Sequence, residues 1–327
     1  MRTTPFLFFF LFLTASVFVR AEHIDSYDFP ALSAEDATLY SACWASEDKG
    51  EKLKVRVWED TSKFSVRYFR SPSPLAETVI VLGGLGSDET AHTSLFLARF
   101  FAEKGYSVLV VPNTFTPDFL LGASSSRVVG DTPSDAKDLY EALLRVKEAA
   151  AGVGLNMESP YLVGYSHGGL LASALARVDE SRQEIRFRSA LLINPAADLL
   201  HGLKTLDSLA AKFEEISFKR LLFFLFKLKG RMKDCSRLPL TQHEPLNFMK
   251  NLGLRKDEAA SLIGMAFSVT LRKLVAATEN LNRFGILPPL EPPSSAAHQA
   301  SRRRRSQAAA DFTYQMYVEN WLKKGHF

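Results

Sequence analysis

The stretch Gly164-Tyr165-Ser166-His167-Gly168 is the feature that most constrains the fold of this chain. A short apolar run precedes it, and a run rich in Ala and Leu follows it at once. This pattern predicts a strand, a tight turn that carries a serine between two glycines, and a helix. A serine on so sharp a turn has a strained backbone, and a side chain at either glycine would strike a neighbouring strand or helix. The turn lifts the hydroxyl above the sheet edge and leaves the amide of His167 free to bind an anion. The alternative is a glycine-rich connection in which the serine has no role.

The first 200 residues alternate between strand and helix patterns. Residues 53–58 and 64–69 alternate apolar with polar, which predicts an antiparallel hairpin half open to water. Later apolar runs are continuous, as in parallel strands covered on both faces: 78–82, 107–111, 161–163 and 190–193. Helical patterns lie between them at 90–104, 133–151 and 169–178, the second opened by a cap at Thr132 and a proline at Pro133. The order predicts an α/β fold with a doubly wound, mostly parallel sheet of six strands.

A second glycine-rich stretch, Gly83-Gly84-Leu85-Gly86-Ser87, closes the third strand. Together with the turn of residues 164–168, which we call the serine elbow, this stretch makes the chain resemble the α/β-hydrolases, in particular secreted members from Gram-negative bacteria. The resemblance covers roughly residues 50 to 200 well and the rest poorly. It implies that Ser166 is a nucleophile and that the amides of Leu85 and His167 form an oxyanion hole, each donor contributing about 3 kcal/mol to the transition state. A plain glycine turn is the alternative, and a phosphate cradle is disfavoured because no Lys follows at the required spacing.

The resemblance also implies an acid and then a histidine after the serine, each following a later strand. No strand pattern follows residue 200, so the acid and base remain unassigned and the last two strands are expected to be missing. A frameshift, a truncated gene or a degenerate family member would produce this. Asp198 is a candidate acid or a helix cap, and His167 is expected to contribute its amide rather than act as base. The histidines from the elbow onward are His167, His201, His243, His298 and His326.

After residue 200 the pattern is helical, and residues 201–286 resemble the helical cap that α/β-hydrolases insert after the sixth strand. Within it, Phe218 to Lys229 is apolar nearly all round with basic residues at its ends, which suits a lid, a substrate-facing wall or contact with a membrane surface. Residues 287–310, rich in proline and holding four consecutive arginines, predict a disordered linker. Residues 311–327 predict a C-terminal helix.

The N-terminus predicts export. Residues 1–21 hold one early arginine, an apolar run and small residues before Glu22, which is typical of a cleaved signal peptide. The mature core would then span residues 22–200, and the protein would be periplasmic or extracellular. In such an oxidising compartment Cys43 and Cys235 either form a disulfide or remain two unpaired thiols.

The composition of the chain excludes few classes of function. The net charge of +4 is spread along the chain apart from the arginine run, which gives no general case for nucleic acid. No His, Cys or Asp cluster has ligand spacing, so no metal or organic cofactor is expected. The resemblance to the α/β-hydrolases implies a serine hydrolase that cleaves carboxylic ester or amide bonds of a small acyl substrate through an acyl-serine, impaired if the acid and histidine are missing. The alternatives are a non-catalytic binding or membrane-surface protein, and an inactive fragment. The oligomeric state is left open.

Overall fold

Among the residues that the structure describes, six strands form a single mixed sheet in the order β1-β2-β4-β3-β5-β6. The computed structural model describes residues 32–41, 49–211, 219–220, 222–224, 226–227, 230 and 245–323, all within the unit Leu32–Phe327. The hairpin of β1 and β2 is antiparallel, and β2 also pairs antiparallel with β4, whereas β4, β3, β5 and β6 run parallel. This confirms the predicted α/β class and the opening hairpin. The strands are β1 (Glu51–Val55), β2 (Phe64–Phe69), β3 (Glu77–Leu82), β4 (Ser107–Val111), β5 (Asn156–Tyr165) and β6 (Ala190–Ile193).

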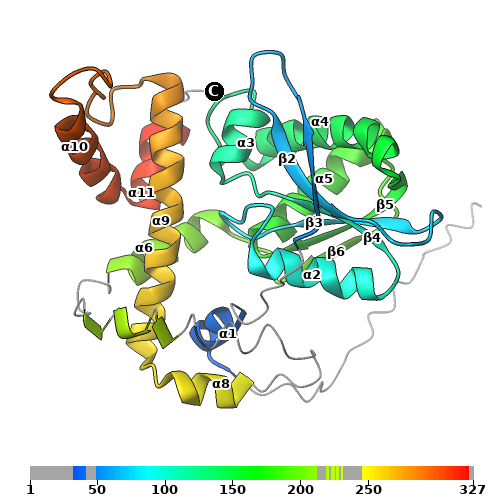
Figure 1. Cartoon of the computed structure of the whole chain (residues 1–327), viewed down its shortest axis with the longest axis horizontal. Helices are drawn as coiled ribbons and strands as arrows, with labels where there is room; N and C mark the ends of the chain where they lie inside the picture. Colours follow the sequence, from blue (N-terminus) through cyan, green and yellow to red (C-terminus); the bar gives the residue numbers. More distant parts are fainter. Residues whose placement is uncertain are drawn as a thin grey trace, which may run out of the picture. The chain divides into compact units, whose positions relative to one another are not determined.

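The alternation of side chains along the parallel strands divides the core between the two faces of the sheet. Val79, Val81, Val108 and Val110 point to the face covered by α2 (His92–Glu103), where they pack with Ala98. Ile80, Leu82, Leu109 and Val111 point to the other face, together with buried residues of α4 (Thr132–Ala150) and α5 (His167–Arg182). Figure 1 shows α4 and α5 on one side of the sheet and α2 on the other. Continuous apolar runs are therefore required here, because every second residue serves a different layer.

The two outer parts of the sheet differ from the prediction. β2 is more buried than a strand half open to water, because Ser65, which points to the face opposite Phe64 and Val66, is only 7% exposed. β6 is the last strand of the sheet among the described residues. Its side chains are not covered on both faces, since Leu191 is 51% exposed and Leu192 is 38% exposed.

The start of α4 also shifts by one residue. Its N-cap is Asp131, not Thr132, and the Asp131 carboxylate accepts a hydrogen bond from the Ser134 amide at 3.1 Å. Pro133 lies in the first turn, as predicted, where its missing N–H costs nothing.

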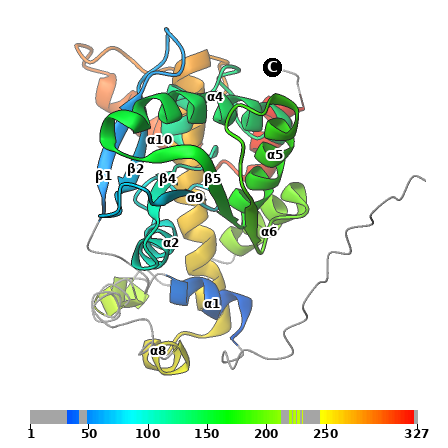
Figure 2. The ribbon, with the colours of Figure 1, turned by 90° about the vertical axis from the view of Figure 1, so that its right-hand side faces the viewer.

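After Ile193 the described residues form helices and no strand, as predicted. The longest is α9 (Lys256–Asn282), which carries Leu271, Leu274 and Val275 into the main core and packs Ala259 and Leu262 in a smaller cluster with Leu39. By length and composition α9 could cross a membrane, but half of its most apolar window is buried in the protein, which suits a core helix. The remaining helices of the described residues are α1 (Ala34–Tyr40), α3 (Pro117–Gly122), α6 (Leu199–Ala211), α8 (Pro245–Leu252), α10 (His298–Ala310) and α11 (Tyr314–Tyr317) (Figure 1). Figure 2 shows α1, α6, α8 and α10 after a turn of 90°.

The prediction of a disordered linker over residues 287–310 is wrong for its second half, which forms α10. Ser301 of this helix is fully buried, and its hydroxyl accepts a hydrogen bond from the Glu291 amide at 3.1 Å. Arg305 donates to the Pro288 carbonyl at 2.8 Å and to the side chain of Asn280, on α9, at 2.7 Å. The arginine run is therefore tied to the fold through Arg305, whereas Arg302, Arg303 and Arg304 remain exposed.

The predicted C-terminal helix is present in part, as α11 followed by one π-helical segment, Val318–Leu322. Tyr317 and Trp321 are fully buried, and the Tyr317 hydroxyl donates a hydrogen bond to the Val129 carbonyl at 2.9 Å. This segment packs in the same core as the sheet.

Some predictions fall outside the described residues. These are the signal peptide with its cleavage before Glu22, both cysteines, and most of the stretch from Phe218 to Lys229. Export, the disulfide and the membrane-surface contact stay predictions.

The carboxyl end of β3 passes very close to the start of α5, and two glycines allow this. A Cβ on Gly168 would lie 2.4 Å from the carbonyl oxygens of Leu82 and Gly83, and one on Gly164 would lie 2.1 Å from the Gly168 carbonyl oxygen. Real side chains do not approach backbone so closely. The predicted steric reason for both elbow glycines is thus confirmed.

We expect Gly168→Ala to destabilise the fold by at least about 3 kcal/mol, because the backbone of β3 or α5 must move to admit a methyl group. Gly202→Ala is the matched control. Gly202 lies inside α6 with no atom within 4 Å of its added Cβ, so the same change should stabilise by about 0.5–1 kcal/mol. Urea denaturation followed by circular dichroism measures both. Equal stability of Gly168→Ala and the unsubstituted protein would contradict the close approach.

Candidate active site

Ser166 has the strained backbone that the sequence predicts for a nucleophile elbow. It stands between β5 and α5 with φ 53° and ψ −125°, in a region of backbone conformation that non-glycine residues rarely adopt. The surrounding backbone holds this geometry. The Ser166 amide donates to the Ile193 carbonyl of β6 at 2.9 Å, and the Ser166 carbonyl accepts from the amides of Gly169, Leu170 and Ala196.

The Ser166 side chain is exposed, and its hydroxyl makes no hydrogen bond with any residue that the structure describes. The hydroxyl is therefore accessible to a substrate. It also lacks, within the described residues, the histidine that would take its proton.

The glycine-rich loop after β3 lies directly beside the elbow. A Cβ built on Gly84 would lie 3.4 Å from the Ser166 Cβ and 2.8 Å from the Tyr165 ring. Gly86 has φ +71°, and its Cβ would clash at 2.2 Å with Thr270 on α9. The loop thus fits between the serine and α9 only because it lacks side chains at these two positions.

Neither Leu85 nor His167 uses its amide in the turn, loop and cap hydrogen bonds of the described residues. The two amides belong to segments that meet at Gly84 and Ser166. The structure thus brings the three sequence-predicted site residues into one region.

The His167 ring is buried, and it contacts the side chains of Phe115 and Asn113. It is 2% exposed, packs edge-on against the Phe115 ring, and places Nδ1 3.0 Å from Asn113 Nδ2. Burial lowers the pKa of His167 to about 4, so the ring is neutral at neutral pH. This agrees with the expectation that His167 contributes its amide.

Asn113, which the sequence did not single out, joins the start of α5 to the glycine-rich loop after β3. Its side-chain nitrogen donates to the Gly83 carbonyl at 2.8 Å, and its amide donates to the Ser87 carbonyl at 2.8 Å. Its side-chain oxygen accepts from the Phe115 amide at 2.9 Å, which leaves its NH2 group facing His167. Asn113 follows the end of β4, at the sheet edge where parallel α/β folds place functional groups; that position was the available signal.

The remaining candidates do not complete a catalytic set among the described residues. Asp198 caps α6, because its carboxylate accepts from the His201 amide at 2.9 Å; of its two predicted roles, the cap is the one observed. The side chain of His201 is exposed, and His298 Nδ1 contacts the Glu291 carbonyl. His243 and His326 lie outside the described residues. The acid and the base therefore stay unassigned.

Searching only the described residues, we find no group of three or more His, Cys, Asp or Glu able to hold a metal ion.

Comparison with known proteins yields structural likeness only. No protein-family model and no curated protein matches the chain. Solved structures that match in part include the esterase Est22 (16% identity, TM-score 0.37), an inhibited esterase B from Lactobacillus rhamnosis (20%, 0.32) and an esterase from Pyrobaculum calidifontis (18%, 0.36). The alignments cover 49%, 50% and 50% of this chain and 50%, 51% and 50% of those chains, respectively. The chain thus spans about half the length of these structures.

The mostly parallel sheet and the strained turn at Ser166 are the fold features that the sequence predicted. Identities at this level say nothing of substrate or activity.

We expect His167 to remain neutral when the pH falls from 8 to 5. Its pKa of about 4 is below the unfolded value near 6.5, so the unfolded chain takes up the proton first. The His167 contribution to stability is therefore complete above pH 6.5 and is lost as the pH falls toward 4, by about 3 kcal/mol in all. The imidazole ¹⁵N shifts of labelled protein measure this directly. A His167 midpoint near 6.5 would contradict the buried position.

Proposed function

We propose that this chain is a serine acyl hydrolase in which Ser166 attacks the carbonyl carbon of carboxylic ester or amide bonds. The amides of Leu85 and His167 would donate hydrogen bonds to the oxygen that becomes negative. Collapse of the tetrahedral intermediate would release the alcohol or amine and leave an acyl group on Ser166. Water would then hydrolyse this acyl-serine to a carboxylic acid and restore the free serine.

The observation that carries the proposal is the strained backbone of Ser166. A φ of 53° with ψ −125° costs on the order of 1–3 kcal/mol and persists only where the surrounding structure enforces it. A simple strand-to-helix connection does not need that conformation. It is useful to a nucleophile, because it presents the hydroxyl at the sheet edge beside the amide at the start of α5.

The position of the oxyanion loop supports the same reading. Gly84 lies against Ser166, and Asn113 fixes both ends of the loop through the carbonyls of Gly83 and Ser87. Donors held in place before the reaction stabilise a developing charge without reorganising during it.

The proton of Ser166 needs an acceptor, and none is assigned. Serine hydrolases without part of their triad retain about 10³- to 10⁴-fold acceleration over water through the oxyanion hole and binding. We therefore propose slow turnover of activated esters with a small acyl group. Without turnover, the binding protein remains as the second candidate, because no described histidine contacts Ser166.

Labelling with a fluorophosphonate probe tests the proposal. We expect slow, saturating modification of the full chain at one site, abolished in Ser166→Ala. Ser173→Ala is the matched control, because Ser173 is an exposed serine on the same helix whose hydroxyl donates to the Leu170 carbonyl. This control should label as the unsubstituted protein does.

The same three proteins are then compared for hydrolysis of p-nitrophenyl acetate. A weak rate lost only in Ser166→Ala is the expected result. Labelling or hydrolysis that survives Ser166→Ala would show that Ser166 is not the nucleophile.

A further inference from the structure

A pocket lies between α4 and α5, away from Ser166. Its volume is about 840 Å³, within the range of small-molecule sites. Its lining on α5 runs from Ala174 to Arg182, which are 8 and 16 residues beyond Ser166 and therefore about 12 and 24 Å along the helix. The pocket is thus separate from the proposed active site.

The inner lining of the pocket is apolar. Ala136 is fully buried, and Ala174, Val178 and Trp58 are half-buried. The Trp58 indole N–H donates to the Ala123 carbonyl at 2.7 Å, so the polar end of the ring is already satisfied within the protein. What Trp58 offers to the pocket is aromatic surface. Such a lining suits an aliphatic or aromatic group.

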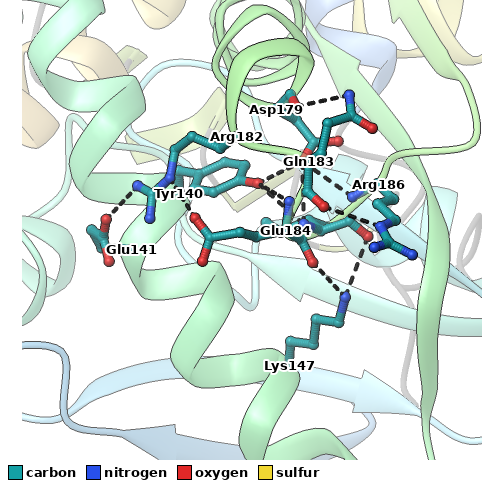
Figure 3. A network of polar contacts seen from close by, with 9 residues as sticks. Tyr140, Glu141, Lys147, Asp179, Arg182, Gln183, Glu184 and Arg186 are labelled. Atoms are coloured by element: carbon teal, nitrogen blue, oxygen red, sulfur yellow. Dashed lines mark hydrogen bonds and ion pairs between the residues drawn. The ribbon is translucent and has the colours of Figure 1, made fainter.

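The acidic side chains of the pocket are already bonded within the protein. Arg182 forms ion pairs with Glu141 and with Glu184, as Figure 3 shows. The Asp138 carboxylate is buried and accepts two hydrogen bonds from Ser125, one from its amide at 2.7 Å and one from its hydroxyl at 3.0 Å.

Two cationic side chains of the pocket have no described bonding partner. Lys137 on α4 and Arg177 on α5 are exposed, and neither makes an ion pair or hydrogen bond with a described residue. Arg182 already pairs with Glu141 and with Glu184, so Lys137 and Arg177 are the lining cations without a described acidic partner. A negatively charged group on a ligand would supply that partner.

We infer that this pocket binds a small amphipathic carboxylate, such as a medium-chain fatty acid. The alkyl chain would lie over Trp58, Ala136 and Val178, and the carboxylate would lie between Lys137 and Arg177. A neutral apolar molecule would leave both cations without a partner, and a small inorganic anion would leave the apolar lining in contact with water. The inference does not depend on the proposed function, because it uses no residue of the elbow.

Quenching of tryptophan fluorescence by a bromine-labelled decanoate, below its micelle concentration, tests the inference on the full chain. We expect saturable quenching that is lost in Trp58→Phe, and competition by unlabelled acids that strengthens up to about fourfold for each added methylene. Decanol, which has the same chain without the charge, should compete at least about tenfold more weakly.

Charge reversal tests the carboxylate contact. The double variant Lys137→Glu/Arg177→Glu should weaken binding of the labelled decanoate by about tenfold or more. The control Arg303→Glu/Arg304→Glu makes the same change in net charge on α10, at exposed side chains without described partners, and should leave binding unchanged. If circular dichroism shows that the first variant is misfolded, Lys137→Gln/Arg177→Gln replaces it, with weaker binding again expected.

Several outcomes would overturn the inference. These are an absence of saturable quenching, quenching that survives Trp58→Phe, decanol competing as well as decanoate, and equal weakening by both charge reversals. Binding only to vesicles of anionic lipid, with no effect of free decanoate, would also overturn it, in favour of a membrane surface.

Discussion

The arrangement of this protein depends on one close approach of backbone to backbone. The end of β3 and the first turn of α5 meet with no room for a side chain at Gly168, and the turn between β5 and α5 has none at Gly164. This contact sets the angle at which α5 leaves the sheet, and it forces Ser166 into its strained conformation. The same contact places the loop after β3 beside the serine. Fold and candidate site therefore share one cause.

Asn113 extends that contact into a small buried network. The Asn113 side chain donates a hydrogen bond to the Gly83 carbonyl and contacts the His167 ring. The Asn113 backbone amide donates to the Ser87 carbonyl. Asn113 is 1% exposed and His167 is 2% exposed, so both side chains are shielded from water. His167 is kept neutral by this burial. The His167 ring thus lies against Asn113, which in turn binds the loop after β3.

The sequence predicted the parts of the structure that depend on local pattern. The runs 107–111 and 190–193 match β4 and β6 to the residue, and the glycines of the elbow have the steric roles expected of them. The structural features that depend on contacts between residues far apart in the sequence were not predicted. β6 has the same apolar pattern as the inner strands although Leu191 and Leu192 are exposed at the sheet edge. The helix α10 has almost no apolar residues beyond alanine, and it is held by Ser301 and Arg305. Asn113 gave no signal beyond its place after a strand.

We propose that the strained turn at Ser166 and the glycine-rich loop after β3 form a working oxyanion hole. The decisive experiment is a crystal structure of the chain after reaction with a small organophosphate. We expect a phosphorus–oxygen bond to Ser166 Oγ, with the phosphoryl oxygen about 2.7–3.1 Å from the amide nitrogens of both Leu85 and His167. An adduct whose phosphoryl oxygen points away from these amides, or a Ser166 with negative φ, would contradict it.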